Sequence, residues 1–269
     1  MIISTIFRNR TTQKILRVVV PLAFWLGAWQ LAAIWVDTVY TPGHGALLLP
    51  SPLLVWERLA ALAARPSFWR TAAVSLGRIF GGFALGAAAG TLLAVITSAL
   101  SWADWLFRPM VKVIRAVPVA SFIILALIWF SSRSLSVLIS FLIVLPVLYT
   151  NLLSGIRAAD PQLLEMARVF RVPALRGIRY VYLPQVLPYF RSACGSALGL
   201  CWKSGIAAEV IGMPDGSIGE QLQQAKIYLN TPDLFAWTLV IVLLSATLST
   251  LAAWALRRAK RALCGEVEG

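Results

Sequence analysis

Four long stretches of this chain contain no charged side chain, and they restrict it to one class of fold. Residues 18–36, 79–103, 134–156 and 234–256 lack Asp, Glu, Lys and Arg, and residues 116–132 form a shorter stretch of the same kind. A helix needs about 20 apolar residues to cross a hydrocarbon core roughly 30 Å thick. The apolar residues are continuous rather than alternating, which argues against a membrane β-barrel. We therefore predict an all-α polytopic membrane protein.

A further predicted span, residues 192–211, is long enough to cross the bilayer but is interrupted by Lys203 and Glu209. The chain of 269 residues is 59% hydrophobic and 13% charged, whereas soluble domains carry about 25% charged residues. We expect about six transmembrane helices in a membrane domain at residues 15–256. Around and within it we expect a cytoplasmic leader at 1–14, a long outer loop at 37–70, a cytoplasmic loop at 155–188 and a cytoplasmic tail at 257–269.

The distribution of charge sets the orientation of these spans. The chain has 24 Lys and Arg against 11 Asp and Glu, a formal net charge of +13. With six spans, 17 of the 24 basic residues fall on one side, in both termini and in the loops around 108–115 and 157–191. Cytoplasmic loops carry such an excess, so both termini are expected in the cytoplasm. Because the basic residues are divided among separate membrane loops, nucleic acid is not expected as a partner.

The basic insert at residues 160–184 separates two apolar runs and is expected on the cytoplasmic face. Asp160 is a favourable helix N-cap, and Pro161 suits the first helical turn. Pro173 ends this helix, because proline disfavours a helical conformation in the residue before it. An apolar stripe follows helical spacing: Leu163, Leu164, Ala167 and Phe170. The pattern predicts two short helices joined by a turn, the second near 174–182, which either rest on lipid headgroups or bind another protein.

Several short motifs occur in the order and spacing of one family of membrane proteins. Glu165-Met166-Ala167, followed by a turn and Leu183-Pro184, resembles the EAA loop of ABC importer permeases. Over about residues 15–256 the chain is similar to the binding-protein-dependent permeases of the sulfonate, nitrate, taurine and thiamine-precursor group. The other motifs of that group are matched by Leu49-Pro50-Ser51-Pro52, by Gly155-Ile156-Arg157 with Asp160-Pro161, by Ala208-Glu209 with Gly212, and by Gly216-Ser217-Ile218-Gly219.

The resemblance implies a type I ABC importer permease core, in a multi-pass protein of the bacterial inner, or plasma, membrane. Such a permease forms the translocation pathway for a small nutrient of the sulfonate, nitrate, taurine or pyrimidine (thiamine-precursor) type. The implied partners are two copies of a separate ABC ATPase, a second permease chain in a homodimer, an extracytoplasmic solute-binding protein and membrane lipid.

The same resemblance assigns the chemistry of ATP hydrolysis to another subunit. The chain has no GxxxxGK[ST] phosphate loop, so we expect it to be non-catalytic, with no cofactor or metal of its own and with ATP and Mg²⁺ on the partner ATPase. The helix at 161–172 would insert into a groove on that ATPase. The residues implied in coupling are Asp160, Leu164, Glu165, Met166, Ala167, Phe170, Arg171, Leu183 and Pro184.

Two positions in the loop depart from the family pattern. Met166 replaces the middle alanine of the motif, and Arg171 stands where the family has the glycine of the turn. Glycine allows a left-handed backbone there, which costs other residues about 1–2 kcal/mol. Either the turn is built differently around Pro173, or Arg171 contacts the partner directly.

Two charged residues of the predicted fifth span are candidates for the translocation pathway. A charge near the bilayer centre costs about 2.5–3.5 kcal/mol or more. Lys203 is therefore expected either to line the pathway and attract an anionic substrate, or to snorkel or pair with another group. Glu209, near the outer end, either contacts the substrate or anchors a loop by accepting hydrogen bonds.

Glycines spaced four residues apart, Gly82, Gly86 and Gly90, mark a helix face that another helix can approach closely. We expect this face to pack within the chain, with a dimer contact as the alternative. Pro118 and Pro146 lie in predicted spans and are expected to kink them, as packing features, as hinges or as both.

Two other functional classes are compatible with a chain of about six spans. A self-sufficient secondary transporter or channel would be expected to show carboxylates for a coupling ion near mid-membrane, or inverted repeats, and the sequence shows neither. A membrane scaffold without transport activity is less compatible with proline-kinked helices and with Lys203.

Overall fold

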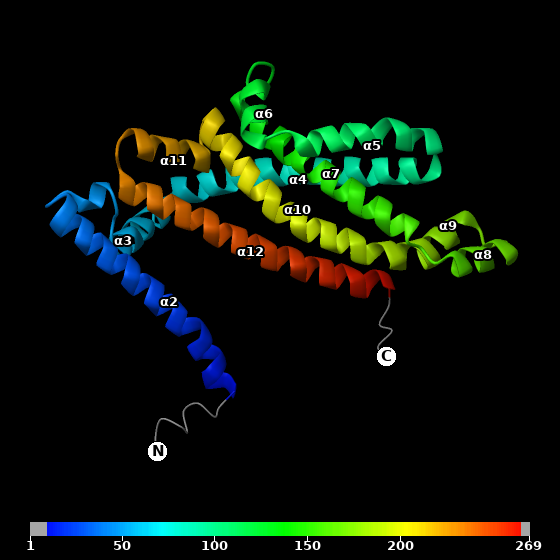
Figure 1. Cartoon of the computed structure of the whole chain (residues 1–269), viewed down its shortest axis with the longest axis horizontal. Coiled ribbons are helices and arrows are strands. Elements are labelled where there is room, and N and C mark those ends of the chain that lie inside the picture. The colour runs from blue at the N-terminus through cyan, green and yellow to red at the C-terminus, as the bar shows by residue number, and fades with distance from the viewer. Residues whose placement is uncertain (1–9, 265–269) are drawn as a thin grey trace. The chain divides into compact units, whose positions relative to one another are not determined.

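The computed structural model describes residues 10–264, and every regular element within this range is helical (Figure 1). Residues 1–9 of the predicted leader and residues 265–269 of the predicted tail lie outside the described range. The chain divides into two compact units: one contains residues up to 68 together with 222–239, and the other contains residues 69–221 and those from 240 onward. The all-α class is confirmed.

The longer helices account for most of the chain. Their bounds are α2 (Arg10–Trp35), α3 (Pro52–Ala63), α4 (Pro66–Ala99), α5 (Ser101–Ala116), α6 (Val119–Ala126), α7 (Ser132–Arg157), α8 (Pro161–Val169), α9 (Ala174–Gly177), α10 (Leu183–Gly212), α11 (Ile218–Ile227) and α12 (Thr231–Cys264). Short elements complete the chain: the wide helical turns Val36–Tyr40 and Ile178–Tyr182, and a 3-10 turn at Gly45–Leu47.

In the described part of the chain, four helical segments are long and apolar enough to cross a membrane: Val19–Tyr40, Pro66–Ala99, Ser132–Arg157 and Thr231–Ala255. The bent pair of α5 and α6 gives a fifth if it is counted as one span. The predicted fifth span, at 192–211, lies in α10, which has 30 residues and so has sufficient length, but which carries Arg191, Lys203 and Glu209. The polytopic architecture is confirmed. Four or five of the described segments pass this test of length and hydropathy, and α10 does not because of its polar residues.

The apolar stretch at residues 116–132 does not form one continuous helix. The helix α5 already begins at Ser101, and it ends where the chain bends by 99° into α6. Val117, which precedes Pro118, has ψ of 128° and is therefore extended. Proline causes this break, because its ring disfavours a helical conformation in the preceding residue. Pro146 lies inside α7 without ending it.

The second unit is built around α7. Side chains of α7 form a buried cluster with those of α6 and α10. The cluster consists of Ile123, Ala126, Leu135, Ile139 and Ala208. The glycine face of α4 packs directly on α7. A Cβ at Gly86 would lie 2.8 Å from the carbonyl oxygen of Phe141, and one at Gly90 would lie 2.7 Å from that of Leu145. The expectation that these glycines pack within the chain is confirmed.

The first unit contains the outer loop predicted at 37–70. Trp29 of α2 donates its indole N–H to the carbonyl of Pro50 at 3.1 Å, and Arg58 of α3 pairs with Asp233 at 2.9 Å. The rings of Phe68 and Trp237 are stacked with centroids 5.0 Å apart. These contacts hold the loop against the beginning of α12.

Candidate functional site

The loop between α7 and α10 begins with a well-formed helix cap. Asp160 accepts a hydrogen bond from the backbone N–H of Gln162 at 2.8 Å, and Pro161 occupies the first turn of α8. The backbone N–H of Asp160 donates to the side-chain oxygen of Gln185 at 2.8 Å. Gln185 belongs to the first turn of α10, so this bond ties the two ends of the loop together. Sequence reasoning missed Gln185, although it directly follows the recognised Leu183-Pro184 pair.

No residue of α8 is buried in this chain. Leu164 and Ala167 are half-buried. Leu163, Glu165 and Met166 are exposed, and Phe170 exposes 75% of its surface. An apolar helix face with nothing packed on it is typical of a surface that binds a partner. The predicted apolar stripe is therefore divided: Leu164 and Ala167 are half-buried, whereas Leu163 and Phe170 are exposed.

The turn after α8 keeps the left-handed geometry that glycine usually provides. Arg171 has φ of +50°, and its N–H donates to the carbonyl of Arg168 at 3.0 Å. The N–H of Val172 donates to the carbonyl of Ala167 at 2.9 Å. These two bonds form a Schellman motif, in which the residue after the helix adopts the left-handed conformation. Of the two alternatives, the first is wrong: Arg171 occupies the family turn rather than replacing it.

The second part of the loop merges with α10. The backbone remains right-handed helical from α9 through the wide turn Ile178–Tyr182 and into α10, where Leu183 and Pro184 lie in the first turn. From Ala174 to Gly212 this helical segment extends about 58 Å at 1.5 Å per residue. The helical backbone is therefore continuous from the second part of the loop into α10.

One face of α10 is polar and uncovered in this chain. Ser192, Ser196 and Lys203 are exposed and lie on one side at helical spacing. A Cβ at Gly195 or Gly199, beside them, would meet nothing within 4 Å. In the described part of the chain Lys203 has no hydrogen-bond or ion-pair partner. Charged residues in spans face a bundle interior or a water-filled cavity rather than lipid, so this face requires such an environment.

Glu209, at the other end of α10, is completely buried. Its carboxylate accepts a hydrogen bond from the hydroxyl of Ser75 at 2.6 Å and a longer one from the N–H of Gly219 at 3.4 Å. The N–H of Ile218 donates to the same Ser75 hydroxyl at 2.9 Å. A Cβ at Gly219 would collide with the backbone of Glu209. Of its two predicted roles, this geometry favours that of loop anchor.

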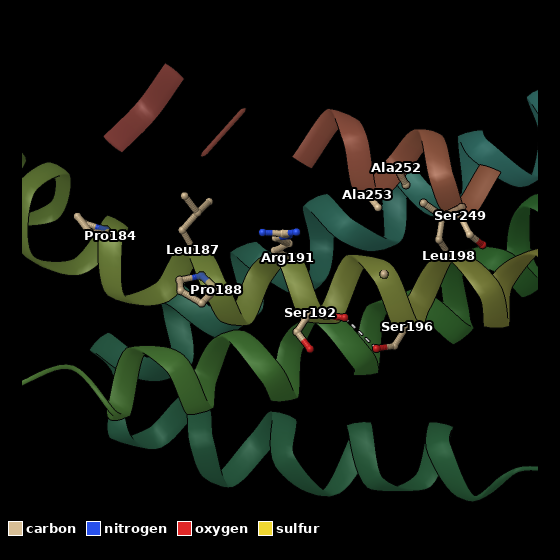
Figure 2. A pocket seen from close by; sticks show the side chains of 11 residues that line it. Pro184, Leu187, Pro188, Arg191, Ser192, Ser196, Leu198, Ser249, Ala252 and Ala253 are labelled. Atoms are coloured by element: carbon tan, nitrogen blue, oxygen red, sulfur yellow. Dashed lines mark hydrogen bonds between the residues drawn. The ribbon is translucent and has the colours of Figure 1, made fainter. Parts of the chain in front are cut away.

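A cavity of about 560 Å³ lies between the first half of α10 and the second half of α12 (Figure 2). Leu187 and Arg191 project from α10 toward α12, whereas Ser192 points away from it. Ala252 and Ala253 of α12 face the cavity. Arg191, which the sequence placed in a cytoplasmic loop, is thus a half-buried residue of α10.

Residues 82–263 match the family described as the binding-protein-dependent transport system inner membrane component. The chain belongs to this family. It is the membrane-spanning permease of an ABC importer, as the loop motifs predicted. The match includes α5 to α12, and with them the loop and the candidate residues Lys203 and Glu209 of α10.

Individual relatives agree with this assignment. The permease is 30% identical to the aliphatic sulfonates transport permease protein SsuC of Escherichia coli (strain K12), over 87% of this chain and 86% of that one. It is 26% identical to the riboflavin transport system permease protein RibX of Chloroflexus aurantiacus (strain ATCC 29366 / DSM 635 / J-10-fl), over 82% and 83%. A bacterial ABC transporter that imports the acidic polysaccharide alginate shares the fold, with a TM-score of 0.61, 15% identity and coverage of 93% and 99%.

Proposed function

We propose that α8 couples this permease to a separate ABC ATPase, two copies of which serve a permease homodimer. The uncovered apolar residues Leu163, Met166 and Phe170 support this, because they offer a ridge that a groove on another protein can bury. The same loop also exposes four arginines: Arg168, Arg171, Arg176 and Arg179. ATP and Mg²⁺ bind to the ATPase, and this chain performs no catalysis.

Because the helical backbone is continuous from α9 into α10, a displacement of the loop would also displace α10 in the membrane. The bond from Asp160 to Gln185 joins the start of α8 to the start of α10. When two ATPases close around ATP, they displace α8, and α10 moves with it. Both termini and the loop lie in the cytoplasm, and the protein resides in the bacterial inner membrane with its solute-binding protein on the opposite side.

The translocation pathway lies between two copies of the chain and is lined by the polar face of α10. Lys203 carries this assignment, because it is charged, exposed and unpartnered within the described residues of a membrane helix. Its positive charge favours a small anionic cargo. The relative from Escherichia coli is named for aliphatic sulfonates, which are anions. The relative named for riboflavin makes a heteroaromatic cargo the second candidate.

Co-purification tests the coupling role of α8. The tagged permease is solubilised gently from its native membrane, and the ATPase recovered with it is quantified by mass spectrometry. Phe170→Glu is expected to reduce that recovery at least about tenfold, since a buried phenylalanine contributes about 1.5–3 kcal/mol. Leu53→Glu is the matched control, because Leu53 is a similarly exposed apolar residue of α3 in the outer loop.

Equal ATPase recovery with Phe170→Glu and Leu53→Glu would contradict the assignment of α8. Recovery of wild-type permease without any ATPase would instead favour the self-sufficient transporter.

A further inference from the structure

The helix α5 rises along α7 instead of lying in a cytoplasmic loop. At its start, Asp104 pairs with Arg157 at the end of α7, with an N–O distance of 3.1 Å. Toward its end, Ile114 lines a small cavity together with Ile143 of α7. Fourteen residues of α7 separate Ile143 from Arg157, and this corresponds to about 21 Å of helix. The helix α5 therefore extends from the cytoplasmic end of α7 well into the depth of the membrane.

The helix α5 has three kinds of surface around its axis. Ala103 and Val111 are buried in the packed side. Leu106 and Val113 are apolar and exposed, as on a surface that faces lipid. The third surface is exposed and basic, and it consists of Arg108, Lys112 and Arg115. The spacing of four and three residues places these side chains on one helical face.

The basic residues of this face differ in their partners. Arg108 is held by Asp104 at 2.7 Å, near the cytoplasmic end. Lys112 and Arg115 have no hydrogen-bond or ion-pair partner within residues 10–264. They follow Asp104 by eight and eleven residues, so they lie about 12 and 16 Å further along the helix. In a hydrocarbon core roughly 30 Å thick, that depth requires water or a counter-charge.

Within residues 10–264, the membrane-spanning helices of the second unit hold no carboxylate that is free to supply that counter-charge. Among the described helices that run through the membrane-spanning part of the second unit, acidic residues occur at Asp104 and Glu209. Asp104 is bound by Arg108 and Arg157, and Glu209 is completely buried. An identical second copy would bring the same two occupied carboxylates. The charges of Lys112 and Arg115 therefore require water or an anion that does not belong to these helices.

We propose that the basic face of α5 lines the aqueous translocation pathway and that Lys112 and Arg115 select cargo with an anionic head group, such as a sulfonate or carboxylate. This inference rests on the proposed permease function, and it assigns selectivity to residues other than Lys203. The elbow before α6 ends the basic face, because Val117 and the residues after it are uncharged up to Ser132.

Cysteine modification in inverted membrane vesicles tests this proposal without knowledge of the cargo. The vesicles contain the intact transporter with its native partners, and the permease carries Cys264→Ser to lower background. Lys112→Cys is compared with Val113→Cys on the adjacent apolar surface. Each is treated with an anionic reagent, 2-sulfonatoethyl methanethiosulfonate, and with the cationic trimethylammonium analogue. The anionic reagent is itself a small alkyl sulfonate.

Lys112→Cys is expected to react readily, and Val113→Cys to remain unmodified. Because Arg115 remains nearby in Lys112→Cys, the anionic reagent should react roughly fivefold faster than the cationic one, relative to their rates with a free thiol. Adding Arg115→Gln should abolish this preference. ATPase co-purification is measured on the same variants and should stay at the wild-type level.

Three results would overturn the proposal. An unreactive Lys112→Cys would mean that this face is not in water. Reaction without preference for the anionic reagent would remove the selective role. The third result comes from the same Lys112→Cys variant in phosphatidylcholine nanodiscs. If its cysteine at position 112 is protected from the reagents only after phosphatidylglycerol is added, lipid headgroups occupy this face. None of these results would affect the coupling role of α8, which is judged from ATPase recovery.

Discussion

Two adjacent glycines of α4 provide a direct test of the packing between α4 and α7. A Cβ at Gly82 would lie 2.6 Å from the Cβ of Ser140 and would also overlap the carbonyl oxygen of Val137. A Cβ at Gly81 would meet nothing within 4 Å. Gly82→Ala must therefore push the two helices apart, whereas Gly81→Ala leaves the packing of this chain unchanged.

The magnitude follows from the comparison of the two variants. Both gain the same helix propensity, about 1 kcal/mol for Gly to Ala, so this contribution cancels. The remaining difference is the cost of overpacking, about 1–3 kcal/mol, since the atoms in contact belong to backbone and Cβ positions and cannot rotate away. At about 2–4 °C per kcal/mol for a unit of 150–250 residues, Gly82→Ala should unfold at a temperature about 2–12 °C below that of Gly81→Ala.

Thermal unfolding of both purified variants in the same detergent measures this difference, with tryptophan fluorescence as the signal. Gly86→Ala should behave as Gly82→Ala does, because its Cβ would also approach the α7 backbone. Unfolding temperatures that agree within about 1 °C for Gly81→Ala and Gly82→Ala would refute the close contact of α4 with α7.

Other substitutions test the loop and α10. Arg171→Gly should slow amide hydrogen exchange at Val172 roughly two- to fivefold, because glycine adopts the left-handed backbone with less strain and so stabilises the turn by about 0.5–1 kcal/mol. Leu229→Gly, in a similar turn after α11, is the control. Faster exchange at Val172 in Arg171→Gly would show that the arginine side chain itself holds the turn. Glu209→Ala should lower the free energy of unfolding by about 1–3 kcal/mol, since buried donors lose their acceptor, and an unchanged thermal unfolding curve would contradict the anchor role. Lys203→Gln should reduce uptake of ethanesulfonate by cells while ATPase recovery stays constant; undiminished uptake would argue for a structural lysine.

The sequence predicted those features that depend on local chemistry. Long charge-free runs became α2, α4, α7 and α12, because only helices satisfy the backbone in lipid. The Asp160-Pro161 pair predicted the start of α8, and the family glycine position correctly marked the left-handed residue at Arg171.

Features that depend on tertiary contacts were predicted less well. Arg108, Lys112 and Arg115 were assigned to a loop, because charged residues usually mark the ends of spans. Their spacing on one helical face was the signal that could have identified α5. The clamp between Asp160 and Gln185 and the cavity beside Arg191 join residues distant in sequence, and no local pattern indicates them.

The two ends of α10 are held differently, and this difference determines how a displacement of α8 travels. The C-terminal end of α10, the proposed outer end, is fixed by the buried bonds of Glu209, whereas its N-terminal end is joined to the start of α8 by a part-buried bond at Gln185. Buried hydrogen bonds cost more to break than bonds open to water, so α10 should tilt about its outer end rather than slide. Lys203 is six residues from Glu209 and Ser192 is seventeen, or about 9 and 25 Å along the helix.

Spin labels at Ser192→Cys in a homodimer should therefore change their separation on ATP binding more than labels at Ala207→Cys, two residues from the pivot. Double electron–electron resonance measures both distances, with and without non-hydrolysable ATP. Equal changes at the two positions would indicate that α10 translates as a whole, and the anchor at Glu209 would then not act as a pivot. A larger change at Ser192 would show that α10 tilts about the end that Glu209 holds when the exposed loop is displaced.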